Sequence, residues 1–513
     1  MNPTKGGGVL IIDFGSQYSQ LIAKKIRDNE IYSEIVKAEY ETVRKVAKDF
    51  QAIILSGSPE SVENSIHEDL LDLIFTFKKP MLCICYGMQL VHKRLGGTMN
   101  YGEYPEFGNT KVSKVSEHIL TDGLPINFNV WMSHNDSVIE PAPDFTLLAK
   151  TNNSCTITAN DKLNIYTLQF HPEVEHSEWG DRIIKNFLLL ICRLSQKWKM
   201  GELCEDKVVE IREKIGKDKV LLALSGGLDS SVVAKLLKKA NPESVIGVFV
   251  DNGLLRDKQK AIIIDYFKGE LKNNFHVIDA KKRFYNALTG IENPEEKRRV
   301  VGGLFLEIFK EFVASEKNIK YLAQGTILSD LIESGEKSAN SDVIKTHHNT
   351  ISELRNIFEL IEPLSHLFKE EVRTWGEKLE LPDFILKEHP FPGPGYAIRI
   401  MGEVTEEKIE IIKRVDALFV SKLKKEGLYS KASQAFAVLL NTKSVGVKGD
   451  RRSVGYVVAL RSINTTNFMT VNVTELPFEF LTKVATEIVN SIPEISRVVY
   501  DLSTKPPSTI EWE

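Results

Sequence analysis

Residues 220–231 read VLLALSGGLDSS, and this stretch predicts the architecture around it. An apolar strand pattern ends in a Gly-rich loop, and a helical pattern through Val232, Val233 and Leu236 follows at once. The loop therefore lies at a helix N-terminus, where backbone N–H groups and the helix dipole bind phosphate. It lacks the closing lysine of the GxxxxGK(S/T) loop. An ordinary Gly-rich turn is the alternative, but the aspartate and the two serines favour a phosphate site.

The composition is that of a globular enzyme. At 513 residues the chain has room for about three domains, and 42% of its residues are hydrophobic. A net charge of −4 gives no reason to expect a nucleic-acid partner. No apolar run reaches the ~20 residues of a membrane span, and the first residues lack the apolar core of a secretory signal. Five scattered cysteines favour a reducing compartment, so we predict a cytoplasmic protein without a membrane partner.

Strand and helix patterns alternate along most of the chain, which predicts parallel sheets in an α/β fold. Strands are expected at 9–13, 52–55, 81–84 and 166–170, and again at 220–224, 245–250 and 321–324. A polar helix and linker around 193–205 separates the two series, and the run at 187–192 fits a buried helix end. The turn-rich segment 389–395, HPFPGPG, precedes a helix at 406–425 and strands at 457–460 and 497–500. We therefore predict three domains, at 1–200, 201–392 and 393–513, the last a smaller α+β domain.

A cysteine occupies a reactive position in the first domain. The strand at 81–84 delivers Cys85 to the start of a helix, and a strand-to-helix turn exposes a nucleophile above a parallel sheet. The helix N-terminus also favours thiolate. Cys83, inside the strand, is interpreted as a small buried hydrophobe. An inert buried thiol is the alternative for Cys85, and it is weighed against the residues downstream.

The expected strand at 166–170 ends at His171-Pro172-Glu173, which supplies a base for the thiol. His171 can accept the proton of Cys85, and Glu173 can hold the imidazole in the required tautomer. A histidine at a strand end is usually structural. Its combination with a cysteine at a strand-to-helix turn is far less ambiguous.

The segments 84–89, ICYGMQ, and 169–174, QFHPEV, resemble the class I, triad-type glutamine amidotransferases. The chain departs from that family in having Cys83 where a glycine is usual and SGSP at 56–59 where SGGP is usual. The resemblance implies that Cys85, His171 and Glu173 are catalytic. It also implies oxyanion donors at Gly57, Ser58 and Tyr86, and a glutamine site formed by Gln89, Trp131 and Asp136. Backbone N–H groups are the expected oxyanion donors, so a changed side chain need not remove them.

The SGGLDS loop resembles the pyrophosphate loop of the N-type ATP pyrophosphatases, which cleave ATP between its α- and β-phosphates. This implies a fold like that of the adenine-nucleotide α-hydrolases for the second domain. It also implies that ATP, held with Mg²⁺, is bound by Ser225, Gly226, Gly227, Leu228, Asp229, Ser230, Ser231, Gln324 and Gly325. Asp229 is the magnesium ligand that this resemblance implies. Backbone around 247–251 and 324–326 would recognise adenine.

The whole chain resembles the glutamine-hydrolysing GMP synthases. The resemblance rests on RVVYD at 497–501, KPPSTIEWE at 505–513, HPFPGPG at 389–395 and IKTHHN at 344–349. It implies that the C2 oxygen of xanthosine 5′-monophosphate (XMP) attacks the α-phosphorus of ATP, and that ammonia from the Cys85 site then displaces AMP to give GMP. A homodimer joined through the last domain is also implied.

The same resemblance implies two further groups of residues. A lid and adenylation segment would contain Asp330, Glu333, Lys345, His347 and His348. The XMP site would contain Arg298, Gln434, Lys505, Ile510 and Glu511. Adjacent histidines point apart on most backbones, so we do not expect a zinc site at His347 and His348.

Three other functions compete with this interpretation. One is another glutamine-dependent ATP pyrophosphatase that amidates a different acceptor, such as an NAD synthetase. That enzyme carries a nitrilase-type glutaminase, whose signature differs from the Cys85, His171 and Glu173 set. A tRNA sulfur transferase would need paired thiols and a basic face. A non-catalytic glutamine or nucleotide sensor is disfavoured because both catalytic signatures are intact.

Overall fold

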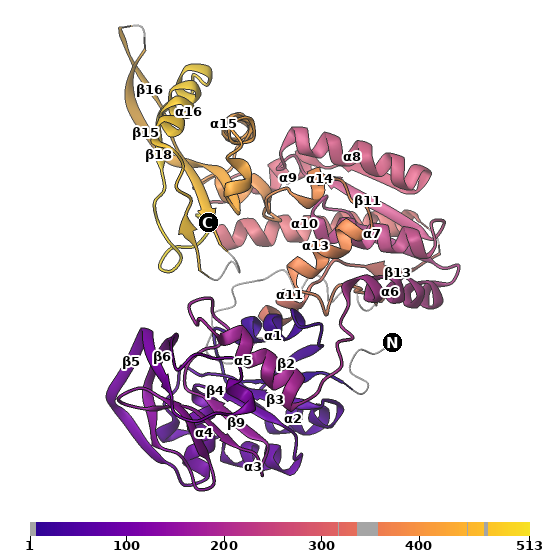
Figure 1. Cartoon of the computed structure of the whole chain (residues 1–513). Helices are drawn as coiled ribbons and strands as arrows, with labels where there is room; N and C mark the ends of the chain where they lie inside the picture. Colours follow the sequence, from indigo (N-terminus) through magenta and orange to yellow (C-terminus); the bar gives the residue numbers. More distant parts are fainter. Residues whose placement is uncertain (1–6, 317, 336–357, 449, 466–469) are drawn as a thin grey trace. The chain divides into compact units, whose positions relative to one another are not determined.

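The computed structural model describes residues 7–316, 318–335, 358–448, 450–465 and 470–513 (Figure 1). The chain forms two compact units, Met1–Lys199 and Met200–Glu513. The predicted site residues Lys345, His347 and His348 lie outside the described residues, as does the side chain of Glu333.

The first unit is built on a nine-stranded sheet in the order β2-β1-β3-β4-β9-β8-β7-β5-β6. Its first five strands are parallel: β2 (Ser33–Lys37), β1 (Val9–Asp13), β3 (Ala52–Leu55), β4 (Met81–Ile84) and β9 (Ile165–Leu168). The strand order reverses between β1 and β3, and ligands of open parallel sheets bind at the carboxyl ends of strands near such a reversal. This edge carries the candidate glutaminase residues.

Four antiparallel strands extend the sheet: β8 (Cys155–Asn160), β7 (Thr146–Lys150), β5 (Thr98–Lys114) and β6 (Asn127–Glu140). The α-helices of the unit are α1 (Ser19–Arg27), α2 (Tyr40–Val46), α3 (Glu68–Thr76), α4 (Tyr86–Arg94) and α5 (Gly180–Lys185). The short helices are η1 (Ala47–Asp49), η2 (Val62–Asn64), η3 (Ile119–Thr121) and the π-helix η4 (Asn186–Ile191).

The strands β3, β4 and β9 are buried at every residue, which explains their continuous apolar or uncharged sequences. Three predictions need adjustment. The strand expected at 166–170 ends at Leu168, so His171 follows a short loop rather than the strand itself. The helix expected around 193–205 begins only at Met200. The run at 187–192 lies mostly in η4 and is buried only in part, since Leu190 is 41% exposed.

The second unit contains a five-stranded parallel sheet in the order β12-β11-β10-β13-β14. Its strands are β10 (Lys219–Ala223), β11 (Val245–Asp251), β12 (Phe275–Asp279), β13 (Ile319–Ala323) and β14 (Glu359–Ile361). Here the order reverses between β10 and β13. The phosphate loop follows β10 and Gln324 follows β13, so the topology brings these two predicted segments to the same edge of the sheet.

The helices of this unit are α6 (Met200–Ile215), α7 (Leu228–Ala240), α8 (Asp257–Leu271), α9 (Lys281–Leu288), α10 (Pro294–Ser315), α11 (Leu328–Gly335), α13 (Lys369–Lys378), α14 (Asp383–Leu386), α15 (Glu406–Lys425) and α16 (Phe478–Ser491), with the 3₁₀ helices η5 (Lys272–Asn274), η6 (Gly395–Arg399) and η7 (Tyr429–Lys431). The helix expected at 406–425 has those bounds. Thr405 caps it by accepting from the amide of Lys408 at 3.3 Å.

A second sheet in this unit contains β15 (Gln434–Lys448), β16 (Arg451–Asn464), β17 (Asn472–Val473) and β18 (Ile495–Tyr500). β15 and β16 form a long antiparallel ribbon that extends away from the parallel sheet of the same unit (Figure 1). β18 runs parallel to β16. The α+β character expected after the HPFPGPG segment is thus present, with its helices α15 and α16.

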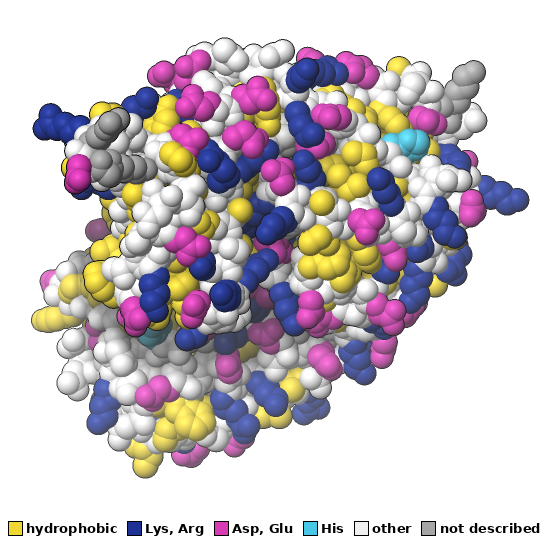
Figure 2. All heavy atoms as spheres, turned by 90° about the horizontal axis from the view of Figure 1, so that it is seen from above, with side chains coloured by type: hydrophobic (Ala, Val, Ile, Leu, Met, Phe, Trp, Pro, Cys, Tyr) yellow, Lys and Arg dark blue, Asp and Glu magenta, His cyan; other side chains and the backbone are white. Residues whose placement is uncertain are grey.

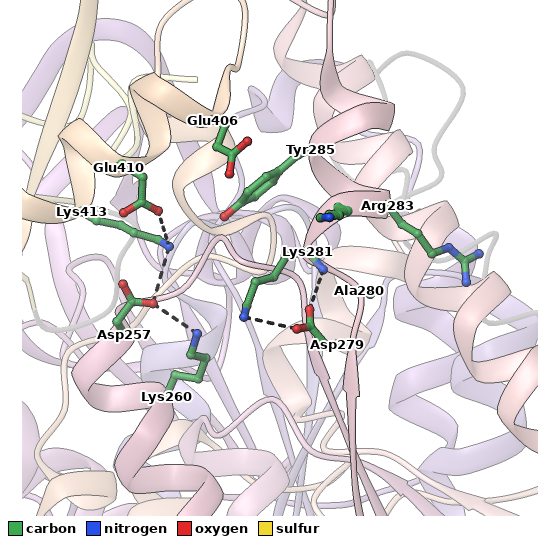
Figure 3. Close-up of a pocket in the computed structure, with 11 residues that line it drawn as sticks. Asp257, Lys260, Asp279, Ala280, Lys281, Arg283, Tyr285, Glu406, Glu410 and Lys413 are labelled. Atoms are coloured by element: carbon green, nitrogen blue, oxygen red, sulfur yellow. Dashed lines mark hydrogen bonds and ion pairs between the residues drawn. The ribbon is translucent and has the colours of Figure 1, made fainter.

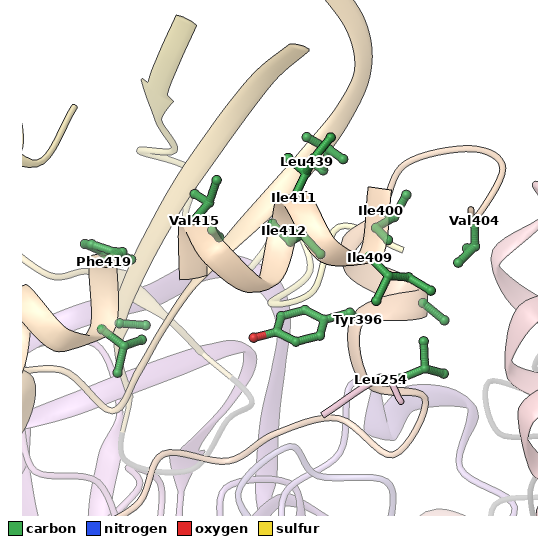
Figure 4. Packing of buried hydrophobic residues seen from close by; sticks show 14 of the residues in the cluster. Leu254, Tyr396, Ile400, Val404, Ile409, Ile411, Ile412, Val415, Phe419 and Leu439 are labelled. Carbon is green, nitrogen blue, oxygen red and sulfur yellow. The ribbon is translucent and has the colours of Figure 1, made fainter. Parts of the chain in front are cut away.

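One hydrophobic core connects both sheets of the second unit (Figure 4). Leu254 follows β11, and it packs in the same cluster as Tyr396 of η6 and Ile412 of α15. Because apolar contacts are continuous across residue 392, the segments on either side form a single compact unit. The domain boundaries at 200 and 392 stay predictions.

Charge and cysteines complete the description. Among the described residues, no helix combines the length and apolar character that a membrane span requires. The five cysteines are Cys83, Cys85, Cys155, Cys192 and Cys204, and all have free thiols. On the face displayed in Figure 2, lysine and arginine side chains are interspersed with aspartate and glutamate.

Candidate functional site

Cys85 lies at the turn between β4 and α4, as the sequence predicts. Its backbone adopts φ 52° and ψ −104°, a region that non-glycine residues rarely occupy. The Cys85 amide donates to the Leu168 carbonyl at 2.7 Å. Glycine is required two residues later, at Gly87, because a Cβ there would lie 2.7 Å from the Leu55 Cβ. The close packing of α4 on β3 therefore holds Cys85 at the carboxyl edge of the sheet.

His171 and Glu173, the other two predicted catalytic residues, are buried like Cys85. The Nδ1 atom of His171 lies 2.7 Å from Oε1 of Glu173, and both side chains are at most 5% exposed. Burial alone would lower the pKa of His171, but the Glu173 carboxylate and the Cys85 sulfur raise that pKa well above its ordinary value. The arrangement thus favours an imidazolium beside the nucleophile. Burial of Cys83 raises the pKa of that thiol, as expected for a core residue.

The expected oxyanion donors surround the nucleophile. A Cβ on Gly57 would lie 3.1 Å from Cε1 of His171 and 3.8 Å from Cβ of Cys85, so Gly57 is next to both. Tyr86 is the first residue of α4, where a backbone N–H has no acceptor within the helix. The hydroxyl of Ser58 is turned back to its own loop, where it accepts from the amide of Glu60 at 3.2 Å.

The residues expected to bind glutamine are only partly brought together. Gln89 donates from Nε2 to the Asp136 carbonyl at 2.6 Å. The Asp136 carboxylate accepts from Ser61 Oγ at 2.5 Å and from the Val62 amide at 3.0 Å, so its side chain is already held by the protein. Trp131 contacts the site through its backbone.

The backbone of Trp131 is bonded to that of His171: the His171 amide donates to the Trp131 carbonyl at 3.2 Å. Two more residues, not singled out from the sequence, contact Cys85 or His171. Gln169 places Nε2 3.9 Å from Sγ of Cys85, and the ring of Tyr18 meets the His171 ring edge-on with 4.8 Å between centroids. Gln169 could have been found from its place in the QFHPEV segment. Nothing local marks Tyr18, which is 153 positions from His171 in the sequence.

The phosphate loop of the second unit is preorganised by its own side chains. Gly226 has φ 79°, and a Cβ there would lie 2.5 Å from Cδ1 of Ile263. Ser225 Oγ accepts from the Gly227 amide at 3.2 Å. Helix α7 begins at Leu228, earlier than the apolar pattern from Val232 suggested. Residues 228–231 therefore form the first helical turn. The Ser231 amide donates to the Gly227 carbonyl at 3.1 Å, so the N–H groups before it in the turn are the ones without an acceptor in the helix.

Asp229 is paired with a lysine that the sequence analysis did not identify. Lys369, the first residue of α13, places Nζ 2.6 and 2.7 Å from the two carboxylate oxygens of Asp229. Both side chains are partly exposed, at 37% and 28%. Gly325 packs against the same turn, because a Cβ there would lie 3.0 Å from Cβ of Asp229 and 3.1 Å from the amide of Ser230. A cation is thus added to the phosphate loop from 140 residues away.

Gln324 and Asp330 lie on the segment that leaves β13. The Gln324 amide donates to the Ile361 carbonyl at 3.0 Å, and its Oε1 is buried without a partner among the described residues. The Asp330 carboxylate accepts from the amide of Ile327 at 3.1 Å, a bond across the start of α11. A carboxylate within the phosphate loop suits Mg²⁺, which usually binds through one or two carboxylates together with substrate phosphates. Asp229 is the residue that fits this requirement.

A second group of predicted residues gathers around the segment 505–513. Gln434 donates from Nε2 to Oε1 of Glu511 at 3.1 Å. Arg298 of α10 donates to the carbonyl of Glu513 and lies 3.3 Å from Glu295. Ile510 packs with Phe436 in a small apolar cluster.

Lys505 forms a two-way backbone pair with Val471, at 2.9 and 3.0 Å. Two basic residues missed by the sequence analysis anchor this segment. Arg399 binds both carboxylate oxygens of Glu511, and buried Lys297 pairs with Glu513. Burial lowers the pKa of Lys297, and Glu513 opposes that effect.

A separate charged hollow of about 720 Å³ lies in the second unit (Figure 3). Its lining comes from the starts of α8, α9 and α15, and includes Lys260, Lys281, Tyr285, Glu410 and Lys413. The cations there are paired with carboxylates, as in the contact of Lys413 with Glu410 at 3.1 Å. None of the residues predicted from the sequence to bind a ligand lines this hollow.

Three family models match successive parts of the chain. The model described as glutamine amidotransferase class-I matches residues 10–191, and one described as NAD synthase matches 202–301. The model described as GMP synthase C terminal domain matches residues 421–512. The first range contains Cys85, His171 and Glu173, and the second contains the loop 225–231.

Full-length relatives share nearly half of the sequence. Proteins named GMP synthase (glutamine-hydrolyzing) from a Thermotoga species and from Petrotoga mobilis are 45% identical to this chain. The alignments cover 98% of this chain, with 100% of the first relative and 99% of the second. The protein of that name from Fusobacterium nucleatum is 44% identical, over 99% of this chain and 100% of its own length.

Proposed function

This chain belongs to the glutamine-hydrolysing GMP synthases, and we infer from that membership that its two units divide one synthesis between them. The enzyme makes GMP from XMP, ATP and ammonia that it releases from glutamine. The observation that carries this conclusion is the 45% identity over the full length of the relatives. A match to the NAD synthase model over 202–301 reflects the shared ATP pyrophosphatase fold, since the glutaminase is of the class I type.

In the first unit, we propose that Cys85 attacks the side-chain amide carbon of glutamine. The C–S bond forms as the carbonyl electrons move to oxygen, and backbone N–H groups at Gly57, Ser58 and Tyr86 stabilise that oxyanion. His171, kept protonated by Glu173, gives its proton to the departing ammonia. Water then hydrolyses the thioester to glutamate. The 2.7 Å contact of His171 with Glu173 supports these roles.

In the second unit, the loop of residues 225–231 would hold the β- and γ-phosphates of ATP, which leave as pyrophosphate. The C2 oxygen of XMP attacks the α-phosphorus, and ammonia then attacks C2 and releases AMP. Charge must be neutralised while two anions meet, so cationic side chains matter most in the first step. Lys369, 2.6 Å from Asp229, is placed to supply part of that charge.

Mg²⁺ bound at Asp229 would neutralise phosphate charge during adenylation. The carboxylate fits this ion because it is partly exposed and lies in the phosphate loop. Gln324 and Gly325 border the same loop and would contact the nucleotide. We propose that Asp330, Glu333, Lys345, His347 and His348 belong to a lid over it, a role supported by the resemblance of residues 344–349 to the family segment.

We propose that XMP is bound by Arg298, Gln434, Lys505, Ile510 and Glu511. A guanidinium and an ammonium suit the 5′-phosphate, and a carboxylate can accept from ribose or base donors. The contact of Gln434 with Glu511 and the position of Arg298 beside Glu513 support a site in this part of the second unit.

We also propose a cytoplasmic homodimer. Free thiols at all five cysteines support a reducing compartment. The β15–β16 ribbon exposes paired apolar side chains, with Val445 at 55%, Val454 at 67% and Val447 at 73%. Such an exposed apolar surface on a β-ribbon is typical of a protein–protein contact.

The test is GMP synthesis by a Cys85→Ala variant with either nitrogen source. The variant should make GMP, AMP and pyrophosphate from ATP, XMP and ammonium, but no GMP with glutamine. Equal loss with both sources would contradict the division of labour. Replacement of XMP by deamido-NAD should abolish AMP release, and AMP release with that substrate would favour the alternative acceptor.

A further inference from the structure

We propose that Arg399 is a positioning residue for the acceptor nucleotide, and that it acts by fixing the carboxylate of Glu511. The inference rests on the proposed function, in which Glu511 contacts XMP. This positioning role for Arg399 and the adjoining HPFPGPG segment goes beyond the roles that the resemblance implies.

The contact between the two side chains is bidentate. Arg399 donates from Nε to Oε2 of Glu511 at 3.0 Å and from Nη2 to Oε1 at 2.9 Å. Gln434 adds a third donor to Oε1 at 3.1 Å. Arg399 is fully buried, while the Glu511 side chain remains 17% exposed. The buried guanidinium of Arg399 therefore holds a Glu511 carboxylate that is still partly accessible.

This geometry leaves Glu511 able to bind a ligand. A carboxylate has about four lone-pair sites, and Arg399 and Gln434 use three of them. The remaining acceptor direction is fixed by the planar fork of the guanidinium, which a lysine could not reproduce. Ordering of this side chain before the nucleotide binds removes an entropy cost from binding.

The HPFPGPG segment holds Arg399 in place. The guanidinium carbon of Arg399 lies 4.6 Å from the ring centroid of Phe391 and 4.1 Å from that of Phe436. The same Phe391 ring contacts a second guanidinium, that of Arg256, at 5.1 Å. Arg256 is itself fixed by Asp416, with Nε 2.6 Å from Oδ2.

Phe391 therefore connects two anchored guanidiniums. Arg256 follows β11, the strand whose carboxyl end borders the phosphate loop, whereas Arg399 reaches the segment that contains Glu511. The buried pair of Arg256 and Asp416 is rigid because the Tyr396 hydroxyl and the Ala437 amide also donate to Asp416, both at 3.0 Å. This chain of contacts fixes the position of Glu511 relative to the parallel sheet.

The experiment uses the full-length enzyme in ammonia-driven synthesis, which bypasses the glutaminase. Arg399→Met should raise the KM for XMP about 10-fold or more, the effect of a lost charge-assisted hydrogen bond. The KM for ATP should change less than about 2-fold. Arg399→Lys keeps the charge but loses the fork, so its KM for XMP should fall between those of the wild type and Arg399→Met.

Arg414→Met is the matched control. This substitution removes an arginine–glutamate pair of the same unit, in which Nη2 of Arg414 lies 2.7 Å from Glu494. The pair is exposed and takes no part in the contacts of Glu511 described above. Its kinetic constants should equal those of the wild type. If Arg399→Met does not fold, Arg399→Lys alone decides, and an unchanged KM for XMP in the folded variant overturns the proposal.

Glu511→Gln separates this proposal from the function on which it rests. If Glu511→Gln leaves the KM for XMP unchanged, the XMP assignment of Glu511 is wrong, and the role of Arg399 falls with it. If Glu511→Gln raises that KM but the Arg399 variants do not, only the present proposal is wrong. The double variant should be no worse than the worse single variant, whereas additive effects would contradict action through Glu511.

Discussion

Substitution of Gly57 by alanine offers a direct test of the glutaminase geometry. A Cβ at this position would lie 3.1 Å from Cε1 of His171, 3.4 Å from Oγ of Ser16 and 3.8 Å from Cβ of Cys85. Ordinary contacts begin at 3.4 Å, so the imidazole must retreat by 3.4 − 3.1, or about 0.3 Å. The backbone of Gly57 is not in the left-handed region, which means that alanine itself causes no conformational strain there.

The size of the effect follows from that displacement. A misplacement of about 1 Å costs roughly 100-fold in rate, so about 0.3 Å corresponds to roughly 4-fold on a logarithmic scale. Overpacking adds about 1–3 kcal/mol of destabilisation to the first unit. We therefore expect glutamine-driven GMP synthesis to fall at least about 4-fold, while ammonia-driven synthesis is unchanged because no atom of the second unit is altered.

The assay measures AMP release with saturating ATP and XMP, first with glutamine and then with ammonium. Gly303→Ala is the control, since a Cβ there meets nothing within 4 Å, and it should affect neither rate. If Gly57→Ala keeps full glutamine-driven activity, the close approach of residue 57 to His171 does not control the position of the imidazole, and the reasoning is refuted. A parallel loss of ammonia-driven activity would refute the separation of the two sites.

Three further predictions concern charged groups. Lys369→Met should raise the KM for ATP about 10-fold or more, because the cation beside Asp229 no longer meets the phosphates, and ammonia-driven kinetics measure this. Glu173→Gln should lower glutaminase activity about 10- to 100-fold. It should also shift the alkaline limb of the rate profile to lower pH, since the carboxylate that raises the pKa of His171 is gone. Burial lowers the pKa of His92 to about 4, so denaturant unfolding should show stability falling by roughly 3 kcal/mol between pH 6.5 and 4.

The sign of the His92 effect follows from linkage. In the unfolded chain the imidazole takes up a proton near pH 6.5, but in the folded protein only near pH 4, so acid favours unfolding over this interval. Nδ1 of His92 accepts from the Ala142 amide at 3.0 Å, which a glutamine oxygen can imitate. His92→Gln should flatten the acid limb, and an unchanged limb would contradict the assignment. For Glu173→Gln and Lys369→Met, Gly303→Ala again serves as the unaffected control.

Much of the fold follows from local patterns. The buried strands β3 and β4 were predicted with their observed bounds because parallel strands covered on both faces have continuous apolar sequences. The helical pattern at 406–425 has the observed bounds of α15, and the structure adds the cap at Thr405. The start of α7 was placed too late, because Leu228 and Asp229 form a first turn that lacks an apolar stripe.

The motifs with candidate catalytic residues are also local. Cys85 follows β4 directly, and the His171-Pro172-Glu173 segment follows β9 after a two-residue loop, so both can be read from their neighbours in the sequence. The phosphate loop is likewise a single continuous segment. The sequence alone therefore determines which chemistry each unit contains: a thiol with a base, and a cradle of N–H groups for phosphate.

Only the tertiary structure decided which charges complete those sites. Lys369 meets Asp229 across 140 residues, and Arg399 meets Glu511 across 112. Neither lysine nor arginine carries a local signal, because a basic residue at a helix terminus is most often solvated. Their partners are set by the strand order and by the common core of the second unit. Long-range packing therefore determines how the loop 225–231, the proposed phosphate site, acquires its cation, and how Glu511 in the proposed XMP site is held in place.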